Sequence, residues 1–328
     1  MGRQVKFKIG IIGCGLIGSK RAKFLGPKGL LIACADTNIN AAKKILPNKN
    51  IKRFTNWRKL LQLKEIDIVI IATPHHELAK ILIEAYRNKK HILVEKPAAK
   101  NLSEIKKIIN KITSNKIKIR IGYNHRYHPS IIKAHKLIKS GSIGTLMYLR
   151  ARYGHGGRLG YEKEWRAKKS LSGGGELVDQ GSHLIDLSRM FLGEFNKVTG
   201  FINTYFWKMS VEDNAFLTLK TNDNKVAFLH ASWTEWKNMF SFEIFGTRGK
   251  LDINGKGGSY GEEQLTFYKM SKKMVKPKLK KWKFKSKDVS WKNEIKEFYK
   301  DIAYNRKPNV NLMDAYQTLK IINKIYKI

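Results

Sequence analysis

The first part of the chain alternates short apolar runs with segments of mixed polarity, in the order strand then helix. Continuous apolar runs such as residues 66–72 are typical of strands that are buried on both faces of a parallel sheet. The expected strands are residues 5–12, 30–35, 51–54, 66–72, 91–94 and 117–121. The expected helices are residues 15–25, 40–46, 57–63, 75–88 and 103–114. This alternation predicts right-handed crossovers and a doubly wound α/β sheet.

The pattern changes after Gly122, where strands follow one another without intervening helices. The links at 222–225 and 246–249 have the composition of hairpin turns. The expected strands are 145–153, 198–207, 215–221, 225–233, 240–245 and 250–253, and the expected helices are 130–140, 176–192, 291–305 and 312–326. We therefore predict two domains: residues 1–121 with the parallel sheet, and residues 122–328 as an α+β domain with an open, mostly antiparallel sheet.

The chain is strongly basic, with 65 Lys and Arg against 26 Asp and Glu and a formal charge of +39. Basic patches bind nucleic acid by releasing counterions, but here the lysines are spread along the chain and no zinc-finger, basic-zipper or RNA-binding pattern occurs. We interpret the charge as a solvated surface and expect no specific nucleic-acid partner. The densest basic segment, 269–287, is also compatible with an edge strand at its alternating end.

The sequence favours a cytoplasmic protein without a membrane partner. No stretch approaches the roughly 18 apolar residues of a membrane span. The basic start and the apolar residues 9–13 imitate a signal peptide, but Gly10 and Gly13 interrupt the run and no small-residue cleavage site follows. The 2 cysteines lie within the first 34 residues and cannot form a disulfide framework, which fits a reducing compartment.

The first candidate site is a glycine-rich loop between the first strand and the first helix. Its residues are Gly13, Cys14, Gly15, Leu16, Ile17 and Gly18, a G-x-G-x-x-G pattern. The three glycines permit a tight turn, close approach of a pyrophosphate and close helix–strand packing, and Asp36 follows the second strand where a carboxylate binds ribose hydroxyls. The alternative is an ordinary glycine turn beside a surface aspartate. The strand–helix context favours dinucleotide binding.

The second candidate is Lys96, within Glu95-Lys96-Pro97 at the end of the strand 91–94. Ligands of doubly wound sheets bind beyond the carboxyl ends of the strands, so Lys96 is expected in that crevice. A lysine there hydrogen-bonds a reacting hydroxyl or carbonyl. On residue type alone, a further surface lysine in a lysine-rich chain is the better explanation.

The third candidate is the segment 173–186, GGGELVDQGSHLID. Asp179 and His183 are four residues apart and share one face of a helix. A carboxylate beside an imidazole suits general acid–base catalysis. The alternatives are a capping or partly buried polar pair, and a metal site that adds Asp186. Because no cysteine or second histidine motif supports metal ligation, we expect no metal.

These three features, in this order, resemble the glucose-fructose oxidoreductase / inositol dehydrogenase family, called Gfo/Idh/MocA. The resemblance covers essentially the whole chain and includes GIIGCGLIG (10–18), ATPHH (72–76), HILVEKP (91–97) and GGGELVDQGSHLIDL (173–187). It implies that Lys96, Asp179 and His183 are catalytic. It also implies a cis peptide bond between Lys96 and Pro97, although trans is by far the commoner isomer in general.

The resemblance further implies which residues contact the cofactor and the substrate. The cofactor set is Gly13, Cys14, Gly15, Leu16, Ile17, Gly18, Asp36, Thr73, Pro74, His75, Glu95 and Lys96. The substrate set is Lys96, Asn124, His125, Arg126, Trp165, Arg166, Asp179 and His183. Family members usually carry Asn where this chain has His75, so a polar helix start is the alternative there. Hinge packing is the alternative for His125 and Arg126, and rim or core packing for Trp165.

We therefore predict an NAD(P)-dependent oxidoreductase that transfers a hydride between nicotinamide and a secondary hydroxyl of a sugar, nucleotide sugar or cyclitol. NAD is expected rather than NADP, because Asp36 repels a 2′-phosphate and no arginine follows it. An apolar sheet face that needs covering favours a homo-dimer or homo-tetramer. The alternatives are redox-assisted glycoside cleavage with tightly held NAD, and a non-enzymatic NAD-binding regulator; an intact acid–base set argues against the regulator.

Overall fold

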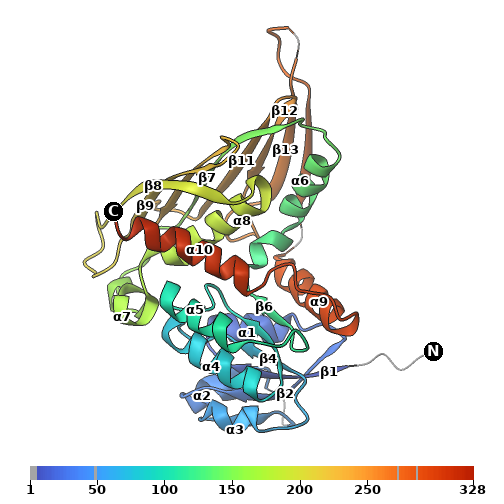
Figure 1. Cartoon of the computed structure of the whole chain (residues 1–328), viewed down its shortest axis with the longest axis vertical. Coiled ribbons are helices and arrows are strands. Elements are labelled where there is room, and N and C mark those ends of the chain that lie inside the picture. The colour runs from blue at the N-terminus through green and yellow to red at the C-terminus, as the bar shows by residue number, and fades with distance from the viewer. Residues whose placement is uncertain (1–5, 48–49, 272, 286) are drawn as a thin grey trace, which may run out of the picture. The chain divides into compact units, whose positions relative to one another are not determined.

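A computed structural model describes residues 6–47, 50–271, 273–285 and 287–328 of the chain. The chain divides into two compact units. The first comprises Met1–Tyr123 and Trp291–Gln317, and the second comprises Asn124–Ser290 and Thr318–Ile328. Figure 1 shows the chain path, with helix α10 (Leu312–Ile325) passing from the first unit into the second.

The first unit contains a six-stranded parallel sheet in the order β3-β2-β1-β4-β5-β6. This order confirms the predicted doubly wound sheet. Its strands are β1 (Phe7–Ile12), β2 (Gly29–Ala35), β3 (Lys52–Phe54), β4 (Ile68–Ile71), β5 (His91–Val94) and β6 (Ile119–Ile121). The helices between them are α1 (Leu16–Lys23), α2 (Ile39–Lys44), α3 (Trp57–Leu61), α4 (His75–Arg87) and α5 (Leu102–Lys111).

Helix α9 (Ser290–Ala303) packs into the core of the first unit. Ile295, Phe298 and Tyr299 join a buried cluster that includes Ile9 and Ile11 of β1. The sequence-based division at residues 121/122 placed this helix in the second domain, whereas packing assigns residues 291–317 to the first unit. The difference arises because chain order alone does not reveal which core a late amphipathic helix covers.

The second unit contains an eight-stranded sheet in the order β14-β13-β12-β11-β7-β10-β9-β8. Its strands are β7 (Leu146–Gly154), β8 (Phe195–Asn203), β9 (Asn214–Thr221), β10 (Val226–Ser232), β11 (Met239–Gly246), β12 (Gly249–Asn254), β13 (Glu263–Lys269) and β14 (Leu279–Phe284). β7 and β10 pair in parallel and every other neighbouring pair is antiparallel, so the sheet is mostly antiparallel, as predicted. β14 ends the strand order, so the basic segment does supply an edge strand.

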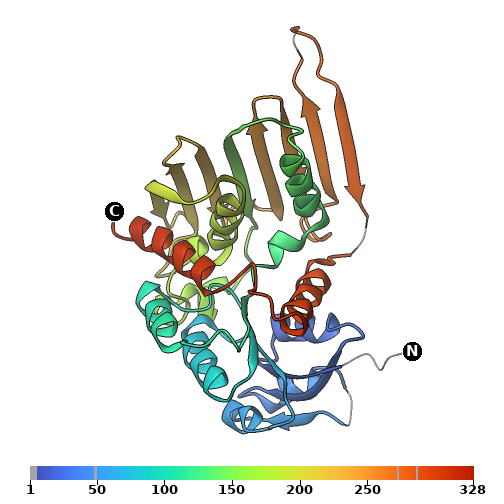
Figure 2. The ribbon, with the colours of Figure 1, turned by 45° about the vertical axis from the view of Figure 1, so that its right-hand side comes forward.

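Helices α6 (Pro129–Lys139) and α8 (Ser182–Leu192) cover one face of this sheet (Figure 2). Burial alternates along β11, as expected where one face of a strand is covered and the other is not. The shorter helical elements of the unit are η1 (Asn124–Tyr127), η2 (Tyr161–Lys163), η3 (Trp165–Ala167), α7 (Lys169–Ser172) and the π-helical η4 (Leu177–Gly181).

Three expectations for the second unit need correction. The strand expected over 198–207 ends at residue 203, because the Asp213 carboxylate accepts the backbone N–H groups of Tyr205, Phe206 and Trp207 and turns the chain. The helix expected over 176–192 begins as a π turn. The pattern also missed β13, which follows a glycine-rich turn.

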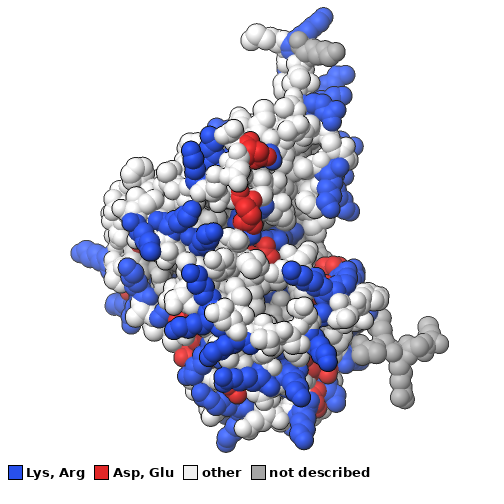
Figure 3. All heavy atoms as spheres, in the orientation of Figure 1, with Lys and Arg blue, Asp and Glu red and all other residues white. Residues whose placement is uncertain are grey.

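Lys and Arg side chains are spread over the face of both units that Figure 3 shows, rather than gathered in one patch. This distribution agrees with a solvated basic surface. Among the residues that the structure describes, no helix combines the length and the hydropathy needed to cross a membrane.

Candidate active site

The glycine-rich loop after β1 is held by backbone packing at its first and last glycine. Gly13 has a positive φ of 90°, and a Cβ atom there would lie 2.5 Å from the carbonyl oxygen of Ala72. A Cβ atom on Gly18 would lie 1.9 Å from the carbonyl oxygen of Gly13. Only glycine therefore fits either position, and the loop brings the start of α1 directly against β1.

Gly15 lies between these two glycines, and neither its backbone conformation nor its packing requires glycine. Its φ of −69° is open to every residue, and a Cβ atom there would meet nothing within 4 Å. It is the N-cap of α1, whose first turn carries no acidic residue. Leu16 beside it is 72% exposed. Open space before the unpaired N–H groups of a helix fits the pyrophosphate of a dinucleotide.

Asp36 is fixed against this loop at the end of β2. Its Oδ2 accepts a hydrogen bond from the Cys14 backbone N–H at 2.7 Å, and its Oδ1 accepts one from the Asn38 N–H at 2.8 Å. A carboxylate offers about four acceptor positions. Asp36 is therefore oriented by the loop that it borders, and its acceptor capacity matches ribose hydroxyls.

Two further predicted cofactor segments follow β4 and β5. Thr73 and Pro74 lead into α4, which begins at the buried His75 with Pro74 as its N-cap. Lys96 follows β5 and is half-buried, and the Lys96–Pro97 peptide bond is cis, as the resemblance implied. All of these residues lie at the carboxyl ends of parallel strands, where ligands of doubly wound sheets bind.

Glu95 lies in a buried ion-pair network. The Arg21 guanidinium of α1 donates to Glu95 Oε1 from Nε at 2.7 Å and from a terminal nitrogen at 2.6 Å, and it also contacts Glu294 of α9. Arg21 and Glu294 are 2% and 0% exposed. Burial raises the pKa of the Glu294 carboxyl, and Arg21 opposes that rise. Arg21 thus ties Glu95, the residue before Lys96, to helices α1 and α9. The predicted contact between Glu95 and the cofactor stays a prediction.

In the second unit, the chain enters the predicted acid–base segment through three glycines, of which Gly174 and Gly175 pack tightly. A Cβ atom on Gly174 would lie 1.8 Å from the Tyr326 hydroxyl, and one on Gly175 would lie 2.0 Å from the carbonyl oxygen of Glu212. The Glu212 carboxylate accepts the N–H groups of Gly175 and Leu177, at 2.9 and 3.1 Å. These bonds anchor the start of the π turn, a feature that is frequent at functional sites.

Asp179 and His183 lie on either side of the junction between the π turn and α8. Arg166 donates from Nε to Asp179 Oδ2 at 3.2 Å, and its guanidinium also lies 4.6 Å from the Trp165 ring centroid. His183 is 6% exposed, and its ring stacks on the His125 ring with centroids 3.6 Å apart and an interplanar angle of 16°. The second unit therefore joins Asp179 with Arg166, and His183 with His125.

Two other predicted substrate residues form side-chain hydrogen bonds within the second unit. Arg126 donates to both oxygens of Asp186, from Nε at 2.8 Å and from a terminal nitrogen at 2.6 Å. Asn124 donates to the Ser290 hydroxyl at 2.8 Å. No group of His, Cys, Asp and Glu that could hold a metal ion was found among the described residues.

Sequence reasoning missed three residues around the histidines. Lys256 is 5% exposed and its Nζ lies 2.7 Å from His125 Nε2, and Tyr153 and Tyr260 flank that Nζ. The available signal was the glycine-rich turn at 255–261, which holds Lys256 and Tyr260 between two strands. In a lysine-rich chain, the sequence alone does not distinguish one lysine in a turn from the others.

Comparison with known proteins agrees with this fold. Residues 7–123 match a family model described as "Oxidoreductase family, NAD-binding Rossmann fold", and residues 131–252 match one described as "GFO/IDH/MocA C-terminal domain". The fold and glycine loop thus define an NAD-binding oxidoreductase. The chain belongs to the Gfo/Idh/MocA family, as the resemblance indicated.

Two of the relatives are named as dehydrogenases of an anhydrosugar and of a cyclitol. The chain is 28% identical to levoglucosan dehydrogenase of Pseudarthrobacter phenanthrenivorans over 61% of this chain and 58% of that protein. It is 26% identical to scyllo-inositol 2-dehydrogenase (NAD(+)) of Bacillus subtilis, over 74% of this chain and 72% of that protein. A levoglucosan dehydrogenase structure in complex with NADH and levoglucosan has the same fold, with a TM-score of 0.87, 24% identity and coverage of 98% of this chain and 96% of the other.

The contrast between Gly15 and Gly18 yields a test of the cofactor site. We expect Gly15→Asn to preserve the fold, because asparagine is a favourable N-cap and no protein atom opposes its Cβ. NADH binding should weaken by at least about tenfold, or 1.4 kcal/mol, because the side chain fills the space before α1. Titration calorimetry measures the affinity and thermal denaturation the stability.

Gly18→Ala is the matched control, since its Cβ meets backbone instead of open space. It should lower the melting temperature as well as the affinity. Unchanged NADH affinity in a folded Gly15→Asn protein would show that the dinucleotide does not approach the chain at this position.

Proposed function

We propose that this protein oxidises a secondary hydroxyl of a sugar, sugar derivative or cyclitol with NAD⁺. The observation that carries this proposal is the buried His183 at the start of α8, stacked on His125 and one helical turn from Asp179. An imidazole is the side chain whose ordinary pKa, about 6.5, suits proton transfer near neutral pH. The levoglucosan and scyllo-inositol dehydrogenases support the substrate class, since each is named for a cyclic polyol or anhydrosugar.

Bound NAD⁺ supplies the hydride acceptor, and the residues of the chain manage the proton and the substrate. His183 accepts the proton of the hydroxyl as its carbon is oxidised. Lys96 donates a hydrogen bond to the reacting oxygen, which becomes a stronger acceptor as negative charge develops. Asp179, which Arg166 holds through one oxygen, orients His183 or accepts from a second substrate hydroxyl.

The remaining predicted substrate residues divide by what they already contact. Trp165 offers a ring face for a sugar, with Arg166 stacked on it. Asn124 and Arg126 are each hydrogen-bonded within the second unit. These bonds support a role in holding the local backbone in place, in addition to any contact with the substrate.

His183→Ala should lose about 10²–10⁴-fold in kcat, the usual cost of removing a positioned acid–base group. A screen of NAD⁺ reduction over sugars, anhydrosugars, inositols and uronic acids identifies the substrate first. The variant is then assayed by NADH absorbance, with NADH affinity as the measure of an intact cofactor site.

His135→Ala is the control, because His135 lies on α6, is half-buried and plays no part in the proposed reaction. It should keep wild-type turnover. If His183→Ala stayed within about threefold of wild type, against the loss expected of a positioned base, the proton would be taken elsewhere. Glycoside cleavage without net NADH would instead identify a redox-assisted lyase.

NAD is proposed as the preferred cofactor over NADP, because the Asp36 carboxylate borders the glycine loop. Asp36→Ala removes the charge that repels a 2′-phosphate, so the ratio of kcat/KM for NAD⁺ to that for NADP⁺ should fall by at least about tenfold, which equals 1.4 kcal/mol. Steady-state assays with both cofactors measure this ratio. An equal ratio in wild type and variant would remove Asp36 from cofactor selection.

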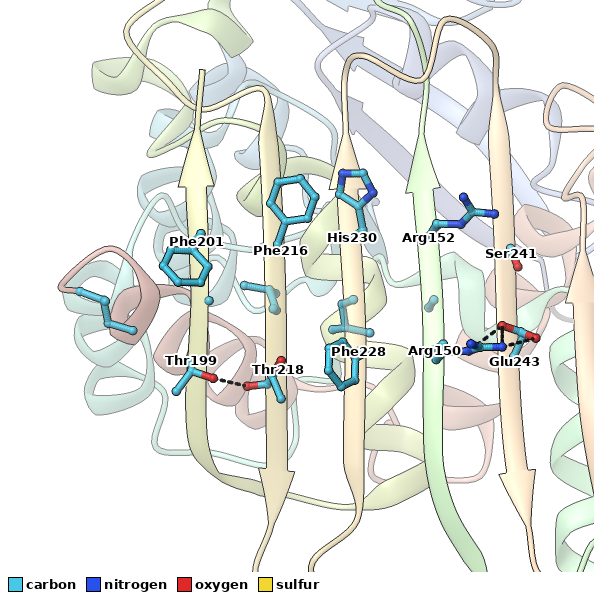
Figure 4. A pocket seen from close by; sticks show the side chains of 15 residues that line it. Arg150, Arg152, Thr199, Phe201, Phe216, Thr218, Phe228, His230, Ser241 and Glu243 are labelled. Atoms are coloured by element: carbon cyan, nitrogen blue, oxygen red, sulfur yellow. Dashed lines mark hydrogen bonds and ion pairs between the residues drawn. The ribbon is translucent and has the colours of Figure 1, made fainter. Parts of the chain in front are cut away.

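We also propose that the uncovered face of the eight-stranded sheet binds a second copy of the chain in a homo-dimer or homo-tetramer. Figure 4 shows Phe201, Phe216 and Phe228 on neighbouring strands of this face, beside the Arg150–Glu243 ion pair. Phe201 and Phe228 are 79% and 57% exposed, and exposed apolar patches of this kind mark interaction sites.

Phe228→Glu places a charge in this face and should convert the oligomer to monomers in sedimentation velocity. Tyr304→Glu, at a residue that is 71% exposed in the first unit, is the control and should leave the assembly intact. A wild-type monomer at micromolar concentration would refute the oligomer. The cytoplasmic location and the absence of a specific nucleic-acid partner stay predictions.

A further inference from the structure

Lys256 is buried among aromatic side chains, which is an unusual environment for a lysine. Its Nζ lies 3.7 Å from the Tyr153 ring centroid, 4.7 Å from that of Tyr260 and 5.1 Å from that of Phe240. Aromatic faces attract a cation, and more strongly where water is excluded. Burial raises the pKa of both tyrosines, that of Tyr260 to about 12, so the rings are neutral near pH 7. This aromatic cage (Tyr153, Phe240 and Tyr260) therefore favours the charged ammonium form.

The charged form of Lys256 fixes the proton state of His125. An ammonium group only donates hydrogen bonds, so His125 Nε2, at 2.7 Å from Nζ, must accept. A ring nitrogen that accepts carries no proton. His125 is therefore a neutral imidazole with its proton on Nδ1, and protonating it would place two positive charges in contact.

His183 shares this constraint because its ring lies parallel to that of His125, with a centroid separation of 3.6 Å. A positive charge within about 4–6 Å disfavours protonation of an imidazole. His125 cannot relieve the effect by becoming charged, since Lys256 holds it in the neutral form. The order of contacts is thus Lys256, His125 and then His183, from the β12–β13 turn through η1 to α8.

Other ionisable groups around the stack come from each neighbouring element. His128, at the start of α6, lies 5.7 Å from His125 between ring centroids, and its Nδ1 is 2.9 Å from Glu263 Oε2 of β13. Its Nε2 lies 3.9 Å from an oxygen of Asp288. Asp179 and Glu176 are nearby carboxylates: after burial, their negative charges add to the rise in the pKa of Tyr153 and Tyr260, which flank Lys256. The carboxylates favour a charged imidazole, so Lys256 is the positive group that opposes them in direct contact with the stack.

We propose that Lys256 is a positioning residue which keeps His183 in its neutral, proton-accepting form, acting through the His125 ring that both residues contact. This role deepens the dehydrogenase function proposed above and rests on it. It predicts that His183 accepts a hydroxyl proton at a lower pH than it would without the positive charge of Lys256. Lys256 itself contacts His125 and the aromatic cage, and no substrate contact is assigned to it.

The test is the pH dependence of kcat/KM, whose acidic limb reports the pKa of the base in the free enzyme. Removing a neighbouring cation raises an imidazole pKa, so the limb of Lys256→Met should move to higher pH by about 1 unit. Lys256→Gln keeps a hydrogen-bond donor without the charge and should move it similarly. Lys256→Arg keeps the charge and should restore the wild-type profile.

Lys90→Met is the matched control. Lys90 is also a buried lysine, 6% exposed, but it donates to the backbone carbonyls of Leu63 and Ile66 in the first unit. Its loss should lower stability and leave the limb in place. An unmoved limb in folded Lys256→Met would overturn the proposed role. A shift in Lys256→Met but not in Lys256→Gln would assign the effect to the hydrogen bond and overturn the role of the charge.

A second measurement needs neither substrate nor turnover. Histidine-labelled wild-type protein, with signals assigned by His125→Gln and His183→Gln, reports ring tautomers and titration by NMR. We expect His125 as the Nδ1–H tautomer and both rings titrating below the ordinary value of about 6.5. A His183 that titrates at or above that value would overturn the inference, even if every variant misfolds. Absence of NADH formation with every substrate, beside the expected NMR result, would instead count against the proposed function alone.

Discussion

The buried guanidinium of Arg21 is the interaction on which the first unit depends. It joins α1, which starts at the glycine loop, to Glu95 at the end of β5 and to Glu294 of α9. A charge with almost no exposure is tolerated only when carboxylates and hydrogen bonds replace water on every side. Because Glu95 precedes Lys96, the same pairing that secures the helix also fixes the backbone that carries the proposed catalytic lysine.

The cofactor loop shows a division between residues that shape the chain and residues that face a ligand. A Cβ atom on Gly13 or Gly18 would clash with backbone atoms of the protein, whereas one on Gly15 would meet nothing within 4 Å. Asp36 belongs to both groups: its carboxylate accepts a hydrogen bond from the Cys14 N–H of the loop, and the same carboxylate is proposed to bind the ribose. Contacts within the protein thus define the conformation of the loop, which limits the entropy lost on binding a dinucleotide.

The second unit builds its proposed acid–base centre by stacking instead of by a carboxylate–imidazole pair alone. Asp179 is held by Arg166, and His183 stacks on His125, whose Nε2 contacts Lys256. These residues come from η1, η3, the π turn, α8 and the turn before β13. Buried polar networks of this kind are sensitive to each member, because an unsatisfied group in a low dielectric is costly.

The sequence by itself determined the parallel sheet, the glycine loop, Asp36 and the position of Lys96 after β5. These follow from local patterns: apolar runs for buried strands, glycines where backbone packs, and strand ends where ligands bind. The pattern also placed Asp179 and His183 on one segment, although the π turn between them has no sequence signature as simple as helical periodicity.

Only the tertiary structure decided which residues surround these groups. Residues 125, 183 and 256 are far apart along the chain, and one lysine of a strongly basic sequence cannot be singled out until folding encloses it among aromatic rings. The assignment of α9 to the first unit is similar, because Phe298 and Tyr299 specify an apolar face but not its partner. Periodicity encodes which face is buried, whereas the identity of the neighbour depends on how distant segments fill the same space.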